Sequence, residues 1–245
     1  MLREFRCDLH VHSCLSPCAD LDMYPRALIE NSIAARLDMI AICDHNASEN
    51  VPYVLKAAER TTLTVIPGME AASSEEVHLL ALFETLDGLR EFQEVVYRHL
   101  AGKNEEKVFG PQVIVNESDE VEGYNERLLI GATSLSLREL IDGIHSLQGL
   151  AIASHIDRES FSVIGQLGFI DPSMPFDALE VSASLGIAAA RIRFPELSDF
   201  PLLTSSDAHF PADIGKAVTV MHLERASFAE LRKALRREDG RRIEE

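Results

Sequence analysis

Two histidines, His10 and His12, stand two positions apart near the amino terminus, in the run DLHVHS at residues 8–13. Residues 5–9 before them have the pattern of a strand. Because side chains at positions i and i+2 of a strand point to the same face, both imidazoles can converge on one point. That geometry suits a metal ion. Packing at the end of a half-buried strand explains an isolated His-x-His pair equally well.

Later apolar runs stop in the same way, at a histidine or a carboxylate. The residues at these stops are His45, Glu70, His155, Asp207 and His209. This pattern is expected where the strands of a barrel present ligands at their carboxyl ends. His78 lies inside a further predicted strand, residues 76–83. The recurrence favours a metal site over simple packing.

Composition limits the class of protein. With 245 residues and 46% hydrophobic content, the chain can form one large α/β domain over residues 1–245. It has no apolar run near the roughly 20 residues of a membrane helix, and its first residues lack the apolar core of a secretion signal, so we expect a cytoplasmic protein without membrane association. The net charge of −17 makes long nucleic acid an unlikely partner, whereas bound divalent ions would still admit a small phosphorylated substrate. The oligomeric state is not indicated.

All four cysteines lie within the first 43 residues, at positions 7, 14, 18 and 43. They lack the paired C-x-x-C spacing, and cytosolic thiols stay reduced, so disulfides are not expected. Cys7 and Cys43 fit buried strand positions. Cys14 and Cys18 lie beside the histidine pair, where each can support the metal site and Cys18 can also ligate.

The predicted strands and helices alternate along the chain, which indicates a parallel α/β sheet. The alternation stops between residues 102 and 131, where the apolar runs 112–115 and 127–130 flank a polar, acidic stretch. We interpret this segment as a β-hairpin-like insertion. It forms either a surface excursion or a cap over the metal site that shapes substrate choice.

The ordered set of motifs resembles the polymerase and histidinol phosphatase (PHP) superfamily of metal-dependent phosphoesterases. The matching motifs are DLHVHS at 8–13, CDH at 43–45, GME at 68–70, His78, SH at 154–155 and SDAH at 206–209. The resemblance extends from residue 5 to about residue 215. It implies a distorted (β/α)7 barrel with an inserted β-hairpin-like segment, and a cluster of two or three divalent metal ions at the carboxyl ends of the strands.

The resemblance also implies which residues bind these ions. His10, His12, Glu70 and Asp207 would hold the first metal, and Glu70 would bridge to a second held by His78 and His155. His45, His209 and one residue of the loop after the His10–His12 pair would hold a third. Alignment on the downstream Pro25 favours Asp20 as that loop ligand, and ungapped alignment brings Cys18 near the position instead. Imidazoles with few carboxylates suit Zn, Mn or Fe.

A phosphoesterase of this kind hydrolyses a phosphomonoester or nucleotide by attack of a metal-bridging hydroxide. Asp207, His209 or a water would protonate the leaving oxygen. Arg158 is a candidate phosphate clamp, and an ordinary exposed ion pair explains it equally well. The alternatives are an exonuclease acting on short RNA or DNA ends and a metal-binding interaction module without catalysis. The remaining histidines, His99, His145 and His222, are predicted to be structural.

Overall fold

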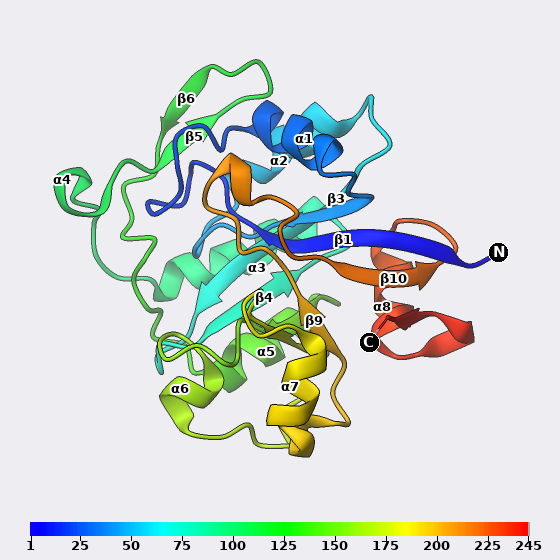
Figure 1. The fold of residues 1–245 in the computed structure, drawn as a ribbon. Coiled ribbons are helices and arrows are strands. Elements are labelled where there is room, and N and C mark those ends of the chain that lie inside the picture. Colours follow the sequence, from blue (N-terminus) through cyan, green and yellow to red (C-terminus); the bar gives the residue numbers. More distant parts are fainter. Residues whose placement is uncertain (245) are drawn as a thin grey trace.

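The computed structural model describes residues 1–244 and has a sheet of nine strands that curls into a nearly closed barrel (Figure 1). The strand order is β11-β10-β1-β2-β3-β4-β7-β8-β9. The strands are β1 (Arg3–Val11), β2 (Met39–Ile42), β3 (Thr64–Ala72), β4 (His78–Leu82), β7 (Leu150–Ala153), β8 (Ala178–Val181), β9 (Leu202–Thr204), β10 (Thr219–Leu223) and β11 (Arg242–Ile243). A separate pair, β5 (Val113–Val115) and β6 (Val121–Tyr124), forms a small hairpin.

Helices cover the outside of this sheet (Figure 1). They are α1 (Pro25–Ala34), α2 (Val51–Ala58), α3 (Leu86–His99), α4 (Glu106–Phe109), α5 (Leu137–Ser146), α6 (Val163–Leu167), α7 (Ile187–Arg193) and α8 (Phe228–Leu235), with 3-10 turns η1 (Pro195–Leu197), η2 (Pro211–Asp213) and η3 (Glu238–Gly240). The helix α5 shows why such segments are helical. Its apolar residues recur at helical spacing, and Ser136 with Glu139 forms a capping box at its start.

Alternate side chains of eight strands meet in one apolar cluster that α8 closes. Because residues of one strand face alternately inward and outward, Ile66 of β3, Leu80 of β4 and Ala178 of β8 mark the inner face of the barrel. Glu70, His78 and Glu180 lie an even number of positions from these residues on the same strands, so their side chains point to the same inner face. The polar residues therefore lie directly above an apolar floor.

The chain after β9 completes the barrel at the end of β1. The N–H of His12 donates to the Ala208 carbonyl at 3.0 Å, and the N–H of Ala208 donates to the His10 carbonyl at 3.3 Å. The β1–β2 pairing also shifts register between Asp8 and Val11. These contacts bring the SDAH motif beside the histidine pair, although about 200 residues separate them in the sequence.

The predicted class, a distorted barrel of the PHP type, is confirmed, and three details differ from expectation. The sheet has nine strands rather than seven, and it is not wholly parallel, since β4 is antiparallel to both β3 and β7 and β10 is antiparallel to β1. The first strand of the insertion, β5, pairs with β6 (Val121–Tyr124) rather than with residues 127–130. Its turn lies within the acidic stretch because Asn116 caps that turn, accepting from the N–H groups of Ser118 and Glu120.

The segment 102–131 contains α4, β5 and β6 and lies beside the amino-terminal loop (Figure 1). The N–H of Val113 donates to the Cys14 carbonyl. The side chain of Asn50 donates to the Val113 carbonyl and accepts from the N–H of Val115. Ile130, at its end, lines the cavity described below. That a single domain spans residues 1–245 stays a prediction. Over residues 1–244, the helices are too short or too polar to span a membrane.

Candidate metal centre

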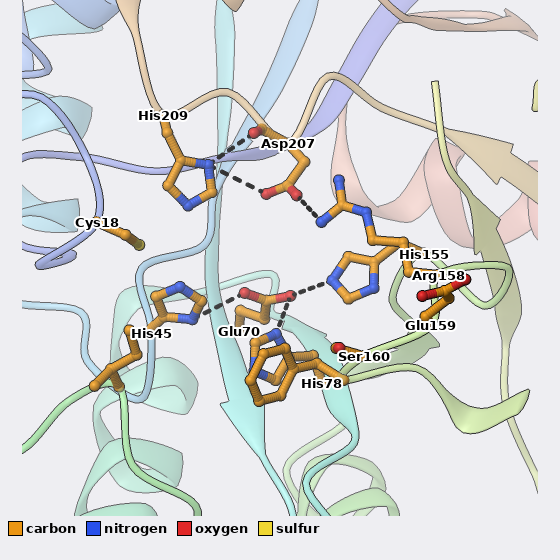
Figure 2. Close-up of a pocket in the computed structure, with 12 residues that line it drawn as sticks. Cys18, His45, Glu70, His78, His155, Arg158, Glu159, Ser160, Asp207 and His209 are labelled. Atoms are coloured by element: carbon orange, nitrogen blue, oxygen red, sulfur yellow. Dashed lines mark hydrogen bonds and ion pairs between the residues drawn. The ribbon is translucent and has the colours of Figure 1, made fainter. Parts of the chain in front are cut away.

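The ends of the strands enclose a cavity of about 470 Å³, which contains most of the predicted site residues (Figure 2). Its lining residues come from seven separate parts of the chain. They are Cys18, His45, Glu70, His78, Ile130, His155, Arg158, Glu159, Ser160, Phe161, Asp207 and His209. His10 and His12 lie beneath this lining and are fully buried.

Glu70 is the centre of the arrangement. Its Oε1 lies 3.1 Å from Nδ1 of His78, 3.3 Å from Nε2 of His10 and 3.4 Å from Nε2 of His155. Its Oε2 lies 3.0 Å from Nδ1 of His45 and 3.6 Å from Nε2 of His12. One buried carboxylate therefore faces five imidazoles, as a bridging ligand between ions would.

Asp207 approaches the same point from the opposite side. Its Oδ1 lies 3.1 Å from Nε2 of His12 and 3.3 Å from Nε2 of His10, and its Oδ2 is 2.6 Å from a guanidinium nitrogen of Arg158. The backbone of Asp207 has a φ of 51°, which is unfavourable for a residue with a side chain. The buried carboxylate of Asp8 accepts hydrogen bonds from the N–H and hydroxyl of Ser206 and so fixes this turn.

The two cavity carboxylates stay ionised in spite of their burial. Burial alone would raise the pKa of Glu70, but the charges of His78 and His10 outweigh it and hold the pKa well below its usual range. The pKa of Asp207 is lowered in the same way, because His10 and His12 more than offset the effect of burial. Burying two anions requires positive charge at the same place.

The donor set fits divalent metal ions. The Nε2 atoms of His10 and His12 point at each other across 3.2 Å, and Oε1 of Glu70 is buried without a well-formed hydrogen bond although three imidazole nitrogens surround it. Three groups of ligand atoms lie within 4.8 Å of one another: His10 with His12 and Glu70; His45 with Glu70 and His78; and His12 with His45 and His209. Ions between these atoms would satisfy every one of them.

The loop after β1 contains both candidates for a further ligand, and the structure orients them differently. Cys18 lines the cavity beside His45 and His209. Burial would raise the pKa of its thiol, but hydrogen bonding to His209 and His45 outweighs this and lowers the pKa to about 6. The Asp20 carboxylate instead accepts from the Asp22 N–H at 2.8 Å and is absent from the cavity lining. The contacts of this loop favour Cys18 over Asp20.

Sequence reasoning missed the carboxylates that lie behind the ligands. Ser16 contacts Nδ1 of His12 at 3.0 Å and donates to the Asp44 carboxylate at 2.7 Å. Glu180 lies 3.0 Å from Nδ1 of His10. Both arrangements direct Nε2 of the ring toward the cavity. The available signal for Glu180 was a charged residue inside the apolar strand Ala178–Val181.

The rim of the cavity consists mainly of the loop after β7. Arg158 is partly exposed, and Phe161 has a φ of 59° and stacks on the ring of His78 at 4.7 Å between centroids. Ile130 of the segment 102–131 lies at the same mouth. The rim thus combines the charged Arg158 and Glu159 and the polar Ser160 with two apolar side chains.

The remaining histidines lie away from the cavity. His99 contacts the Ser134 hydroxyl, His145 lies 2.8 Å from the Asp177 carboxylate, and His222 is opposite Glu4 in the β1–β10 pairing. The cysteines form no disulfide, and Cys7 and Cys43 are buried on the inner side of the sheet.

Buried histidines and carboxylates at the carboxyl ends of a distorted barrel define a metal-binding hydrolase of the barrel class. The chain belongs to the PHP domain family, whose model matches residues 8–167, and a PHP-associated model matches residues 192–239. The predicted superfamily is therefore confirmed. The family match points to hydrolysis of phosphoric ester bonds.

Two of the similar proteins are longer than this chain. The uncharacterized protein YqxK of Bacillus subtilis is 32% identical over 117 residues, which cover 45% of this chain and 29% of that protein. Endonuclease Q from Pyrococcus furiosus, a lesion-specific endonuclease, aligns with 98% of this chain and 58% of its own, at a TM-score of 0.77 and 22% identity. The chain thus spans less than two thirds of either relative.

Two further structures share the fold. A candidate metal-dependent phosphoesterase from Bifidobacterium adolescentis aligns with 95% of this chain and 96% of its own, at a TM-score of 0.62 and 18% identity. Endonuclease Q in complex with a 27-mer duplex carrying an abasic lesion aligns at a TM-score of 0.76 and 22% identity, over 98% of this chain and 58% of its own. The DNA in that structure is bound to endonuclease Q.

Proposed function

We propose that this protein is a metal-dependent phosphoesterase that hydrolyses a small phosphorylated substrate, either a phosphomonoester or a nucleotide. The observation that carries the proposal is the convergence of five imidazoles on the buried carboxylate of Glu70 at 3.0 to 3.6 Å. Divalent ions bound there would supply an ionised water near neutral pH and positive charge facing the phosphoryl oxygens. Zn, Mn and Fe suit this donor set.

The chain's own residues divide the work by position. His10, His12, Glu70 and Asp207 would hold one ion, and His78 and His155 would share Glu70 for a second. His45, His209 and Cys18 would hold a third, with Cys18 in the role that the sequence favoured for Asp20. Supporting this exchange, Cys18 lines the cavity beside both histidines, and the Asp20 carboxylate caps its own loop.

Arg158 would bind a phosphoryl oxygen of the substrate. Its guanidinium already reaches Asp207 at 2.6 Å while part of the side chain stays exposed, so a small movement takes it from this carboxylate to a phosphate at the cavity mouth. An Arg158→Gln variant tests this role. We expect a higher KM with a smaller change in kcat, whereas an arginine that serves only as an ion pair leaves KM unchanged.

Where His209 does not hold an ion, its imidazolium would donate the proton to the leaving oxygen from Nε2; where it holds one, a water would donate it. His209 lies at the partly exposed edge of the cluster, and although burial lowers its pKa, its contacts with Cys18 and Asp207 raise the pKa above the ordinary value. Its Nδ1 bonds to the Asp207 carbonyl at 2.9 Å, which orients the ring. Because the pKa of Asp207 is lowered, its carboxylate would stay ionised and the proton would stay on His209.

The decisive test combines metal analysis with a substrate panel. Purified protein would be analysed for metals, stripped with a chelator and reloaded with Mn²⁺, Zn²⁺ or Fe²⁺. Phosphate release would then be measured on sugar phosphates, amino-alcohol phosphates and nucleotides. We expect metal-dependent release from at least one class and its loss in Asp207→Asn. Metal-loaded protein that hydrolyses none of them would contradict the proposal.

A second candidate function is cleavage near the ends of nucleic acid. The observation that favours it is the fold shared with endonuclease Q over 98% of this chain. Against it stands the excess of 40 acidic over 23 basic residues. Comparing short oligonucleotides with mononucleotides at matched concentration separates the two functions, since an exonuclease would prefer the oligonucleotide.

A further inference from the structure

Glu180 lies behind the metal centre, and neither the sequence motifs nor the cavity lining includes it. It projects from the inner face of β8, directly above Ala178, and is only 2% exposed. Its carboxylate faces away from the cavity, and its contacts are to residues that would bind metal. We propose that Glu180 is a positioning residue that sets two metal ligands, His10 and His155, at the same time. This inference rests on the metal centre of the proposed function.

The first of these contacts fixes the ring of His10. Oε1 and Oε2 of Glu180 lie 3.0 and 3.3 Å from its Nδ1. Because a carboxylate only accepts, Nδ1 must carry the proton. The unprotonated nitrogen is then Nε2, which points to Glu70 and Asp207 at 3.3 Å each. Carboxylates that hold the second nitrogen of a metal-binding imidazole act in this way.

The second contact fixes the backbone that carries His155. The N–H of His155 donates to Oε1 of Glu180 at 3.1 Å, and the N–H of Ile156 donates to the carbonyl of Glu180 at 2.8 Å. His155 has a φ of 28°, a conformation that costs energy in a residue with a side chain. Two consecutive hydrogen bonds to one residue stabilise this strained turn.

These two contacts join ligands that are far apart in the sequence. His10 lies in β1 and His155 follows β7, and Oε1 of Glu180 is shared by the imidazole of one and the amide of the other. Movement of Glu180 would therefore displace two ligands together. A single substitution there should weaken metal binding without removing any ligand.

The residue Asp177 provides a matched control three positions earlier. Its carboxylate lies 2.8 Å from Nε2 of His145 and accepts from the N–H of Ala151 on β7 at 2.9 Å. It thus makes the same two kinds of contact, to an imidazole and to a backbone amide, away from the cavity. Asp177→Asn reports the cost of losing such a carboxylate where no metal is involved.

The experiment compares Glu180→Leu, Glu180→Gln and Asp177→Asn. Each protein would be stripped of metal, checked for folding by circular dichroism and thermal melting, and titrated with Zn²⁺ and Mn²⁺ against a chelating indicator. We expect Glu180→Leu to lose about 10–100-fold in metal affinity, the range typical for groups that orient ligands. Glu180→Gln keeps an oxygen for both contacts and should recover most of the affinity. Asp177→Asn should bind metal like the wild type.

Several outcomes would overturn the proposal. Folded Glu180→Leu protein with wild-type affinity would show that Glu180 does not position the ligands. Glu180→Gln protein as weak as Glu180→Leu would indicate that the carboxylate itself ligates. If Glu180→Leu does not fold, Glu180→Ala takes its place in the comparison, because it removes the same two side-chain contacts. Equal loss of affinity in Glu180→Gln and Asp177→Asn would reflect general destabilisation and contradict the proposal. A wild type that binds no metal would instead refute the proposed function.

Discussion

Two buried charged clusters in this molecule are built in opposite ways. In the first, at the carboxyl ends of the strands, imidazoles and carboxylates face one another around Glu70. In the second, Arg241 near the carboxyl end of the chain makes a two-pronged contact with Glu230 at 3.0 and 3.1 Å and a further contact with Glu224 at 2.8 Å. Both Arg241 and Glu230 are less than 9% exposed.

The difference lies in where the positive charge comes from. Around Arg241 each carboxylate oxygen faces a permanent donor, so the cluster is complete as it stands. Around Glu70 the neighbours are imidazoles, which carry a positive charge only after they bind a proton or a metal ion, and Oε1 of Glu70 lacks a well-formed hydrogen bond. A buried polar cluster that lacks its own cation indicates a metal site, and one that contains a cation indicates a structural role.

The largest expected effect comes from neutralising the centre of the first cluster. Glu70→Gln keeps the size of the side chain and removes the charge that bridges the ions. We expect metal-dependent phosphate release to fall by more than the roughly 100-fold upper range for groups that only orient ligands. The rise in melting temperature on adding Zn²⁺ or Mn²⁺ should disappear as well, because it depends on binding to the folded state.

The metal-free Glu70→Gln protein should melt at a lower temperature than the metal-free wild type. Because the pKa of Glu70 is held below its usual range in the folded protein, the ionised carboxylate stabilises the fold, and this contribution is lost with the charge. The loss should be smaller than that in Arg241→Met, and a loss as large would show that the cluster is held together without metal, as the Arg241 cluster is.

The second expected effect is a loss of stability without a loss of metal binding. Arg241→Met keeps the length of the side chain and leaves Glu230 buried without its partner. We expect the melting temperature to fall by on the order of 5 °C, because an unpaired buried carboxylate is strongly destabilising. Metal affinity and kcat, measured at a temperature where the variant is folded, should match the wild type. A variant with altered metal affinity would show that the two clusters are coupled.

Much of the first cluster was predictable from the sequence, and the second was not. His45 follows the apolar strand β2, and Glu70 lies near the end of β3 after its apolar run, so local patterns were sufficient to identify them. Glu180 and Asp8 act on residues 170 and 198 positions away, through contacts that no local pattern encodes. The strand β11 and its Arg241 cluster escaped prediction for the same reason.

The loop after β1 shows a different limit. Alignment by sequence favoured Asp20, yet Asp20 closes a tight turn with the Asp22 N–H, a local role that short acidic side chains often adopt. Its own N–H donates to the His209 carbonyl at 2.8 Å, and Cys18, two residues earlier, reaches the cavity. Backbone conformation selected the residue that faces the site, and spacing alone could not.

A third effect is expected at the edge of the metal cluster, where the loop after β1 supplies a ligand. Cys18→Ser should lower the affinity for the last-bound ion by about tenfold, because a hydroxyl is a far weaker ligand than a thiolate. Asp20→Asn, which keeps the acceptor for the Asp22 N–H, serves as the matched control and should leave that affinity unchanged. Stepwise titration of stripped protein with Zn²⁺ measures both. The opposite ranking would restore Asp20 as the ligand.

The smallest expected effect separates the two clusters by pH. The Arg241 contact holds the pKa of Glu230 below its ordinary value of 4.5. The stabilisation from a lowered carboxyl pKa is fully present above the unfolded value, and it is lost as pH falls through the folded value. The difference in melting temperature between wild type and Glu230→Gln, which cannot ionise at this position, should therefore stay constant from pH 7 to pH 5 and narrow below pH 4.5.

The metal-induced rise in melting temperature should respond to acid in a higher window. Imidazole ligands must be unprotonated to bind an ion, so protons compete with metal. Burial would lower the pKa of His45, but its contacts with Cys18 and Glu70 raise it to about 10, so this competition is already present at pH 7 and grows as the pH falls. The rise should shrink between pH 7 and pH 5, where the Glu230 difference is still constant. Melting curves of wild type and Glu230→Gln, each with and without Zn²⁺, give both profiles in one series. If the two effects faded over the same pH range, the distinction between a metal-requiring cluster and a self-contained one would fail.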